Sequence, residues 1–173
     1  SHKGFYLYGP SIRISKNLAS KYNHELFVFV SILPLGDYIK PLGNFSFEDA
    51  YKIYKEQLES CKEADVIMFQ TFSDMKDVRA ALLAAKETVT TPIVFDVTFE
   101  KNLRTSTGTD PLTALNICQS MGADMFGINC GLKPDEMLPI VEILIKKSRI
   151  PLIVQPNGGI PKLVDGKTVF DSD

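Results

Sequence analysis

The sequence predicts an α/β fold in which about five parallel strands alternate with helices. Short apolar segments of strand length are separated along the chain by longer segments with helical patterning. This arrangement is typical of parallel sheets, because the crossover helices cover the faces of the strands. A length of 173 residues is enough for one sizeable core, so we expect residues 1–173 to form a single domain.

Five segments are expected to form the sheet, since each is short, apolar and rich in β-branched or aromatic residues. In chain order they are 25–33, 65–71, 92–99, 125–130 and 151–156. Successive residues of a strand point to opposite faces. In the third segment, Phe95 therefore belongs to an apolar face that suits packing under helices. Asp96 belongs to the other face, which would line the interior of a barrel.

The helices are expected from their start signals and apolar periodicity. Their expected ranges are 11–22, 46–64, 73 or 74 to 88, 111–121 and 134–148. Ser46 with Asp49 is a near capping box, and Asp110 followed by Pro111 is an N-cap followed by proline at the first helical position. Near the end of the chain, Asp165-Gly166 lies between two apolar pairs and predicts a hairpin within 159–170.

Two architectures fit this alternation: a five-stranded doubly wound sheet, or part of a (β/α)8 TIM barrel. A whole barrel needs eight strands and typically ~250 residues. A doubly wound sheet often carries a glycine-rich nucleotide motif after its first strand, and none is present here. In both architectures, function lies at the carboxyl ends of the strands.

Composition excludes several kinds of partner. The net charge of −2 provides no basic field, so we expect no nucleic-acid partner. No apolar run approaches the roughly 18 to 20 residues of a membrane helix, so we expect no membrane partner. The three cysteines are widely spaced and odd in number, which predicts a reducing, cytoplasmic location rather than a disulfide framework. With only two histidines, the sequence alone holds no complete metal site.

Polar residues follow the apolar strands at their carboxyl ends. After Pro34, which follows the first strand, they are Gln70, Thr71, Asp96, Thr98, Asn129, Cys130, Gln155 and Asn157. An acid at such a position is either part of a site or held by backbone and hydroxyl groups. Gln70 can orient a polar ligand or be a satisfied buried amide. Cys130, taken alone, is either a metal ligand or nucleophile, or a small packed residue.

In order and spacing, a set of these segments resembles the homocysteine S-methyltransferase family, most closely the homocysteine domain of the cobalamin-dependent methionine synthase type. The residues that carry the resemblance are Phe69-Gln70-Thr71-Phe72-Ser73-Asp74, Thr98-Phe99, Thr105-Ser106-Thr107-Gly108-Thr109-Asp110-Pro111, Gly127-Ile128-Asn129-Cys130, Gln155-Pro156-Asn157-Gly158-Gly159 and Asp165-Gly166-Lys167-Thr168-Val169-Phe170. The resemblance covers nearly the whole chain.

The resemblance implies an incomplete barrel whose strands correspond to strands three to seven of eight. It implies methyl transfer to a zinc-activated homocysteine thiolate in a complete parent protein, with cobalamin or folate modules as further partners. The family holds zinc with three cysteines, and Cys130 matches the first of them. Gln70, Thr71, Asp96 and Asn129 are the residues expected to bind the substrate.

The sequence also departs from the family pattern. It contains no Gly-Gly-Cys-Cys motif, which carries the other two zinc cysteines, so we expect this chain alone to bind no zinc and to be inactive. Gln70 stands where the family commonly has an acid associated with the substrate's amino group. Ser31-Ile32-Leu33-Pro34 stands where the family usually has an Asp-Ile-Gly-Pro-like loop.

These departures leave two alternatives to a fragment of a family enzyme. One is a non-catalytic relative that binds a small ligand or assembles with itself. Open sheet edges would favour such a homo-oligomer. The other is a separate small α/β enzyme that uses Asp96 and no metal.

Overall fold

Five parallel strands form a single sheet in the computed structural model, which describes residues 7–171. The strands are β1 (Phe29–Ile32), β2 (Val66–Phe72), β3 (Ile93–Val97), β4 (Met125–Asn129) and β5 (Leu152–Gln155). They are hydrogen-bonded in the order of the sequence, and every neighbouring pair is parallel. The expected five-stranded α/β fold is therefore confirmed.

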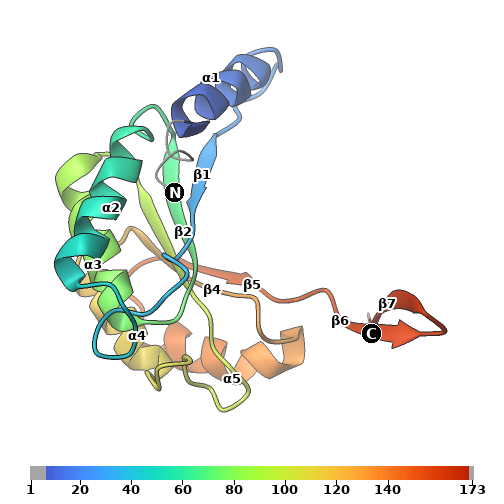
Figure 1. Ribbon diagram of the computed structural model, residues 1–173. Coiled ribbons are helices and arrows are strands. Elements are labelled where there is room, and N and C mark those ends of the chain that lie inside the picture. Colours follow the sequence, from blue (N-terminus) through green and yellow to red (C-terminus); the bar gives the residue numbers. More distant parts are fainter. Residues whose placement is uncertain (1–6, 172–173) are drawn as a thin grey trace.

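Helices alternate with these strands. They are α1 (Tyr8–Ala19), α2 (Phe47–Glu59), α3 (Met75–Thr88), α4 (Pro111–Ser120) and α5 (Pro134–Ile145). Figure 1 shows α2 to α5 along the outer side of a curved sheet, with α1 beside β1. A doubly wound sheet would reverse its strand order and carry helices on both faces. The sequential order instead matches part of a (β/α)8 barrel.

The start signals read from the sequence are confirmed. The Ser46 hydroxyl accepts the Asp49 N–H, and the Asp49 carboxylate accepts the Ser46 N–H, which completes the capping box of α2. Asp74 caps α3, and Asp110 caps α4 ahead of Pro111. The expected hairpin forms from β6 (Ile160–Val164) and β7 (Lys167–Asp171), and it extends away from the sheet (Figure 1).

Some boundaries differ from expectation, most clearly in the segment around β1. The expected strand 25–33 forms only over Phe29–Ile32, because the pairing with β2 begins at the residue opposite Val66. Just before it, the Val28 N–H donates to the carboxylate of Asp65 rather than to a strand neighbour. The helix expected at 11–22 begins earlier, at Tyr8, and ends at Ala19. The helix expected at 46–64 ends at Glu59, where hydrogen-bonded turns lead the chain into β2.

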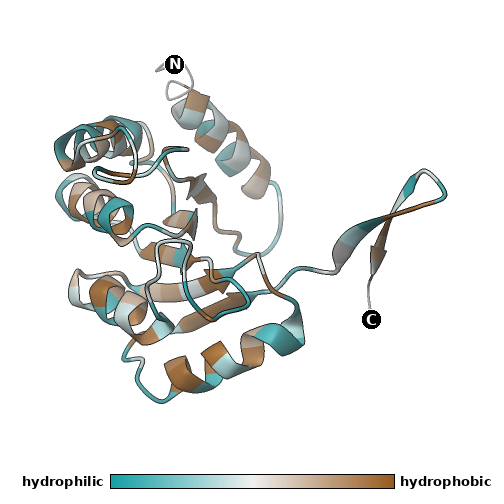
Figure 2. Cartoon of the chain, turned by 60° about the horizontal axis from the view of Figure 1, so that its bottom comes forward, coloured by the Kyte–Doolittle hydropathy of each residue, from teal (hydrophilic) through white to brown (hydrophobic). Residues whose placement is uncertain are grey.

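An aromatic cluster forms the core between the sheet and α2. The Phe69 and Phe95 rings stack with centroids 4.9 Å apart, and the Phe72 ring lies 4.8 Å from Phe95. Tyr54 of α2 contacts Phe69 and Phe72. Phe95 thus faces the helices as expected, so Asp96 faces the opposite side of the sheet. In Figure 2 the strands are predominantly hydrophobic.

The outer strands are much less covered than the central ones. All five residues of β3 are buried. In β1, exposed and buried residues alternate: Phe29 and Ser31 are exposed, and Val30 and Ile32 are buried. In β5, Val154 is exposed. Among residues 7–171, no helix is both long enough and apolar enough to cross a membrane.

Candidate functional site

A bulge near the carboxyl end of β2 shapes the site. The pairing of β2 with β3 changes register between Phe69 and Phe72, and both phenylalanines contact Tyr54 on the helix side. The two residues between them, Gln70 and Thr71, are half-buried at the strand end. Thr71 has a φ of 66°, a left-handed conformation that costs a non-glycine residue about 1 kcal/mol or more. Such strain is concentrated at functional sites.

Asn129 connects three strand ends. Its Nδ2 donates to Thr71 Oγ1 at 2.9 Å, and its Oδ1 accepts from Thr98 Oγ1 at 3.0 Å. Thr98 follows β3, so the bonds join the ends of β2, β3 and β4. Because Asn129 is buried, these bonds satisfy an amide that would otherwise be costly to bury. The predicted residues Thr71 and Asn129 therefore lie together.

Cys130 stands immediately beyond β4 and is exposed. The alternative that it is a small packed residue is therefore wrong. Its backbone φ is 56°, and its N–H donates to the Gln155 carbonyl at 3.1 Å. The amide Nδ2 of Asn129 lies 3.6 Å from its sulfur. The exposed thiol thus belongs to the same group of side chains as Thr71 and Asn129.

The other two cysteines, Cys61 and Cys118, are buried. Burial raises the pKa of the Cys61 thiol to about 12 and that of Cys118 higher still. Because the thiolate is the form that binds metals and attacks electrophiles, neither side chain is suited to chemistry at neutral pH.

Asp96 lies in the interior-facing side of β3 and has no exposed surface. Neither carboxylate oxygen has a hydrogen-bond partner of regular geometry. Burial raises the pKa of Asp96 to about 7, and the nearby Gln70 amide partly offsets the rise. Gln70 is therefore close, but it does not fully satisfy the carboxylate. Its own Oε1 accepts from Ser31 Oγ of β1 at 2.5 Å.

Gly127 provides the space that the Asp96 side chain occupies. The two residues are opposite each other in the pairing of β3 with β4. A Cβ at position 127 would overlap Asp96 Oδ1 and would come within 2.6 Å of a methyl carbon of Ile153. Sequence reasoning did not single out Gly127 as part of the site, since only the register of the two strands reveals this contact.

The residues present do not make a zinc site. Within the part of the chain that the structure describes, no group of three His, Cys, Asp or Glu side chains could hold a metal ion. Cys61 and Cys118 are enclosed in the core and cannot complete a site with Cys130. His24 lies in the connection before β1, and His2 lies outside the described residues.

A second polar cluster joins the loops that follow β1, β2 and β3. The Tyr38 hydroxyl donates to Ser106 Oγ at 3.0 Å, and Ser106 Oγ donates to Ser73 Oγ at 2.9 Å. Within the third loop, Thr105 Oγ1 accepts the Thr109 N–H and closes a local turn. Tyr38, Ser73 and the buried Asp77 also line a pocket of about 230 Å³. Tyr38 was not foreseen, because its contact with Ser106 spans 68 positions of the sequence.

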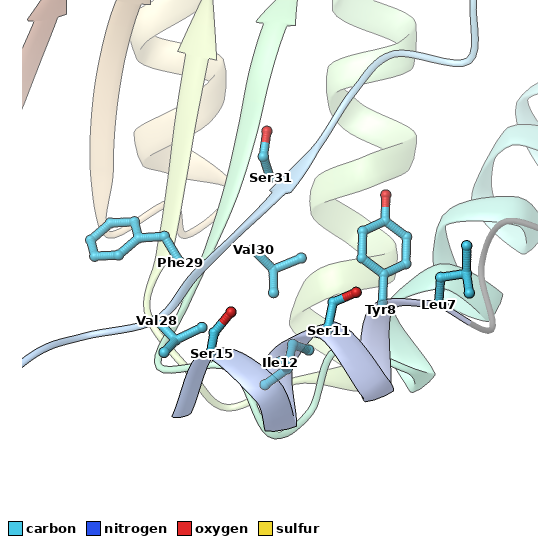
Figure 3. A pocket seen from close by; sticks show the side chains of 9 residues that line it. All are labelled: Leu7, Tyr8, Ser11, Ile12, Ser15, Val28, Phe29, Val30 and Ser31. Carbon is cyan, nitrogen blue, oxygen red and sulfur yellow. The ribbon is translucent and has the colours of Figure 1, made fainter. Parts of the chain in front are cut away.

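A more apolar pocket of about 280 Å³ lies at the edge of the sheet, between α1 and β1 (Figure 3). Its lining includes Ile12 from α1 and Val30 from β1, and Ser31 lies at its margin. It holds none of the residues predicted to bind the substrate, although Ser31 at its margin donates to Gln70.

The fold and these strand ends define the class of protein: an incomplete (β/α)8 barrel with polar residues gathered at the carboxyl edge of its sheet. Residues 3–173 match the family described as homocysteine S-methyltransferase. The chain belongs to this family, and it is a homocysteine S-methyltransferase-like domain.

Two methionine synthases are similar in sequence. The one from Mycobacterium leprae (strain TN) is 30% identical over 148 residues, which cover 82% of this chain and 12% of that protein. The one from Mycobacterium tuberculosis (strain ATCC 25618 / H37Rv) is 29% identical over 158 residues, which cover 87% of this chain and 13% of that protein. The chain thus spans only a small part of these relatives' length.

Solved structures of the homocysteine methyltransferase MmuM from Escherichia coli share the fold. The apo form has a TM-score of 0.78 at 20% identity, over 91% of this chain and 61% of that one. The metallated form has a TM-score of 0.76 at 21% identity, and the match covers 90% of this chain and 59% of that one. The incomplete barrel expected from the resemblance is therefore confirmed.

Proposed function

We propose that this domain binds homocysteine at the carboxyl ends of β2, β3 and β4. Gln70, Thr71 and Asn129 line the substrate position with the buried Asp96 behind them, and Cys130 supplies one thiolate to a metal site that needs further ligands. In a complete protein, the domain takes part in methyl transfer to homocysteine. By itself it binds the substrate without turnover.

The observation that carries this proposal is the exposed Cys130 beside the Asn129 hydrogen bonds. The Cys130 thiol is exposed, and its backbone is strained. The amide of Asn129 beside it is hydrogen-bonded to the ends of two other strands, so the polar groups here are held in fixed positions. The names of the similar proteins, two methionine synthases and a homocysteine methyltransferase, support homocysteine as its ligand.

Zinc does not fit residues 7–171, because structural and catalytic zinc sites use three or four protein ligands and these residues offer no such group. We propose that the metal requires a complete protein. Metal analysis after dialysis should find less than stoichiometric zinc on this chain. Tight, stoichiometric binding that is lost in Cys130→Ser would contradict the proposal.

Substrate binding can be tested by titrating the isotope-labelled chain with L-homocysteine and following backbone amide NMR signals. We expect saturable shifts at residues 70–71, 96–98 and 129–131. Cys130→Ser should keep the binding, since the other side chains remain. Saturable shifts confined to the pocket between α1 and β1 would contradict the proposed position, and the absence of any saturable shift would contradict substrate binding.

For a complete protein, we propose homocysteine as the substrate and cobalamin or folate modules as partners, with residues 1–173 acting as a single domain in the cytoplasm. The two similar methionine synthases are many times longer than this chain, which leaves room for such modules. Limited proteolysis tests the single domain. Rapid cleavage between two stable pieces would contradict it.

A second candidate is a non-catalytic relative that assembles with itself through its open sheet edges. The exposed Phe29 in β1 and Val154 in β5 favour it, since they lie on the two outermost strands of the sheet. A strictly monomeric species at high protein concentration would contradict this candidate.

A further inference from the structure

Asp96 is a buried carboxylate that the local structure leaves without a full partner. It has no exposed surface, and both of its oxygens lack a hydrogen bond of regular geometry. Burying a carboxylate in this state is costly unless a cation or donors compensate it. Such a group at a strand end is a candidate for interaction with a ligand.

The position of the carboxylate is built by the strand beside it. Gly127 lies opposite Asp96, and any side chain there would overlap the carboxylate. The carboxylate therefore fills the space that a β4 side chain would otherwise take, toward the interior of the sheet. It lies beside Gly127 of β4 and near Gln70 of β2.

Gln70 connects this carboxylate to the open side of the sheet. Its Oε1 accepts from Ser31 Oγ at 2.5 Å, and Ser31 is exposed in β1. Its amide also lowers the pKa of Asp96, as a donor near the carboxylate does. The amide oxygen thus faces the exposed Ser31 hydroxyl, and the amide group lies near Asp96.

We propose that Asp96 is a positioning residue for the substrate's ammonium group. It holds the Gln70 side chain with its amide oxygen turned toward the open side, and it places a negative charge behind that amide. The ammonium then replaces the Ser31 hydroxyl at Gln70 Oε1. An amide alone has no charge for a cation, and Asp96 supplies that charge from the neighbouring strand. The inference rests on the proposed function, since the ligand is an α-amino acid.

The test compares L-homocysteine with 4-mercaptobutanoate, which has the thiol and carboxylate but no amino group. Both are titrated into the labelled chain, and the ratio of the two dissociation constants measures recognition of the ammonium. Wild type should prefer homocysteine. Asp96→Asn should reduce this preference about tenfold by removing the charge, and the readout is the ratio of the two dissociation constants rather than either affinity alone.

Moving the negative charge from position 96 to position 70 tests whether Asp96 acts through its charge or only supports the structure. In the Asp96→Asn background, Gln70→Glu puts the carboxylate on β2, and the preference should return to at least its wild-type value. Gln70→Leu in the wild-type background should lose the preference, although Asp96 remains. Ser31→Ala should keep it, because the hydroxyl is displaced by the ligand. Gln70→Leu and Ser31→Ala also keep the proposal testable if Asp96→Asn fails to fold.

The outcomes distinguish this inference from the proposed function. If wild type and Gln70→Leu both prefer homocysteine to the same extent, the positioning role is overturned and homocysteine binding stands. If Asp96→Asn keeps the full preference, the role is likewise overturned. If wild type binds neither compound, both the proposed function and this inference are wrong.

Discussion

The central strands and the outer strands of this sheet differ in what surrounds them. Every residue of β3 is buried, and its Phe95 is enclosed by two other phenylalanines. In β1, by contrast, Phe29 is 52% exposed, and apolar side chains of the adjacent α1 such as Ile14 are also exposed. Both strands are apolar in sequence. Their burial depends on how many neighbouring units the sheet provides.

This difference follows from the strand order, because β2, β3 and β4 have a paired strand on both sides and β1 and β5 have one. The polar strand ends at β2, β3 and β4 have their neighbours, so the hydrogen bonds of Asn129 are formed. The outer strands retain apolar surface of the kind that other parts of a protein, or another copy, normally cover.

The largest expected effect is the loss of a central aromatic side chain. Phe95→Ala removes a fully buried ring and should lower the free energy of unfolding by about 4 kcal/mol. Phe29→Ala, its match in β1, should cost less than about 1 kcal/mol, because half of its ring is already in water. Urea unfolding of both variants measures the two costs. Equal costs would mean that β1 is covered in solution, and the contrast would fail.

The second prediction concerns pH. The folded pKa of Asp96, about 7, lies above its ordinary value of 3.8, so its charged form is disfavoured by folding. Its stabilising contribution is complete below pH 3.8 and is lost as the pH rises through 7. At about 1.4 kcal/mol per pH unit, the loss has an upper limit of about 4 kcal/mol. Asp96→Asn should therefore be more stable than wild type at pH 8, but not at pH 4.

Urea unfolding at several pH values measures this effect, and Asp37→Asn is the matched control. The Asn44 side-chain amide, with backbone N–H groups, lowers the pKa of Asp37, so its contribution is lost as the pH falls rather than as it rises. If the stability of Asp96→Asn relative to wild type is the same at pH 4 and pH 8, the carboxylate is not strained by burial.

The third prediction concerns the space beside Asp96. Gly127→Ala should destabilise the domain by about 2 kcal/mol, because the new Cβ overlaps the carboxylate and approaches Ile153. Gly158→Ala is the control on a loop, where nothing lies within 4 Å of the added carbon. Thermal unfolding compares the two. In an Asp96→Ser background the cost of Gly127→Ala should decrease, and an unchanged cost would contradict the crowding.

The smallest effect on folding is expected at the open edge. Phe29→Lys places a charge on the exposed face of β1 and should change the free energy of unfolding by less than about 1 kcal/mol. It should nevertheless weaken any association through this edge, since edge charges oppose strand pairing. Sedimentation over a range of concentrations compares the variant with wild type. Identical association of the two would exclude this edge as the contact.

Much of the fold could be predicted because its signals are local. Ser46 with Asp49, and Asp110 with Pro111, mark helix starts within four residues, so neighbouring chemistry alone fixes them. The hairpin around Asp165-Gly166 is equally local. The ends of β1 could not be predicted in this way, because pairing with β2 determines where the strand begins and ends.

In the candidate site too, the features with local signals could be predicted and those that depend on strand pairing could not. Alternation along a strand was enough to put Asp96 and Phe95 on opposite faces. The bulge that accommodates both Phe69 and Phe72 on the helix side has no signature in its sequence, since it depends on the register with β3. The contact of Gly127 with Asp96 depends in turn on the register of β3 with β4.

The sequence by itself determined the alternation of strands and helices, the polar strand ends and the family, because each is written in residue type and order. Only the tertiary structure decided that Cys130 is exposed, that Asn129 joins three strand ends, and that Asp96 is buried with both carboxylate oxygens unsatisfied. The physical reason is that burial and hydrogen bonding depend on which residues become neighbours across strands, and those neighbours lie 20 to 60 positions apart along the chain.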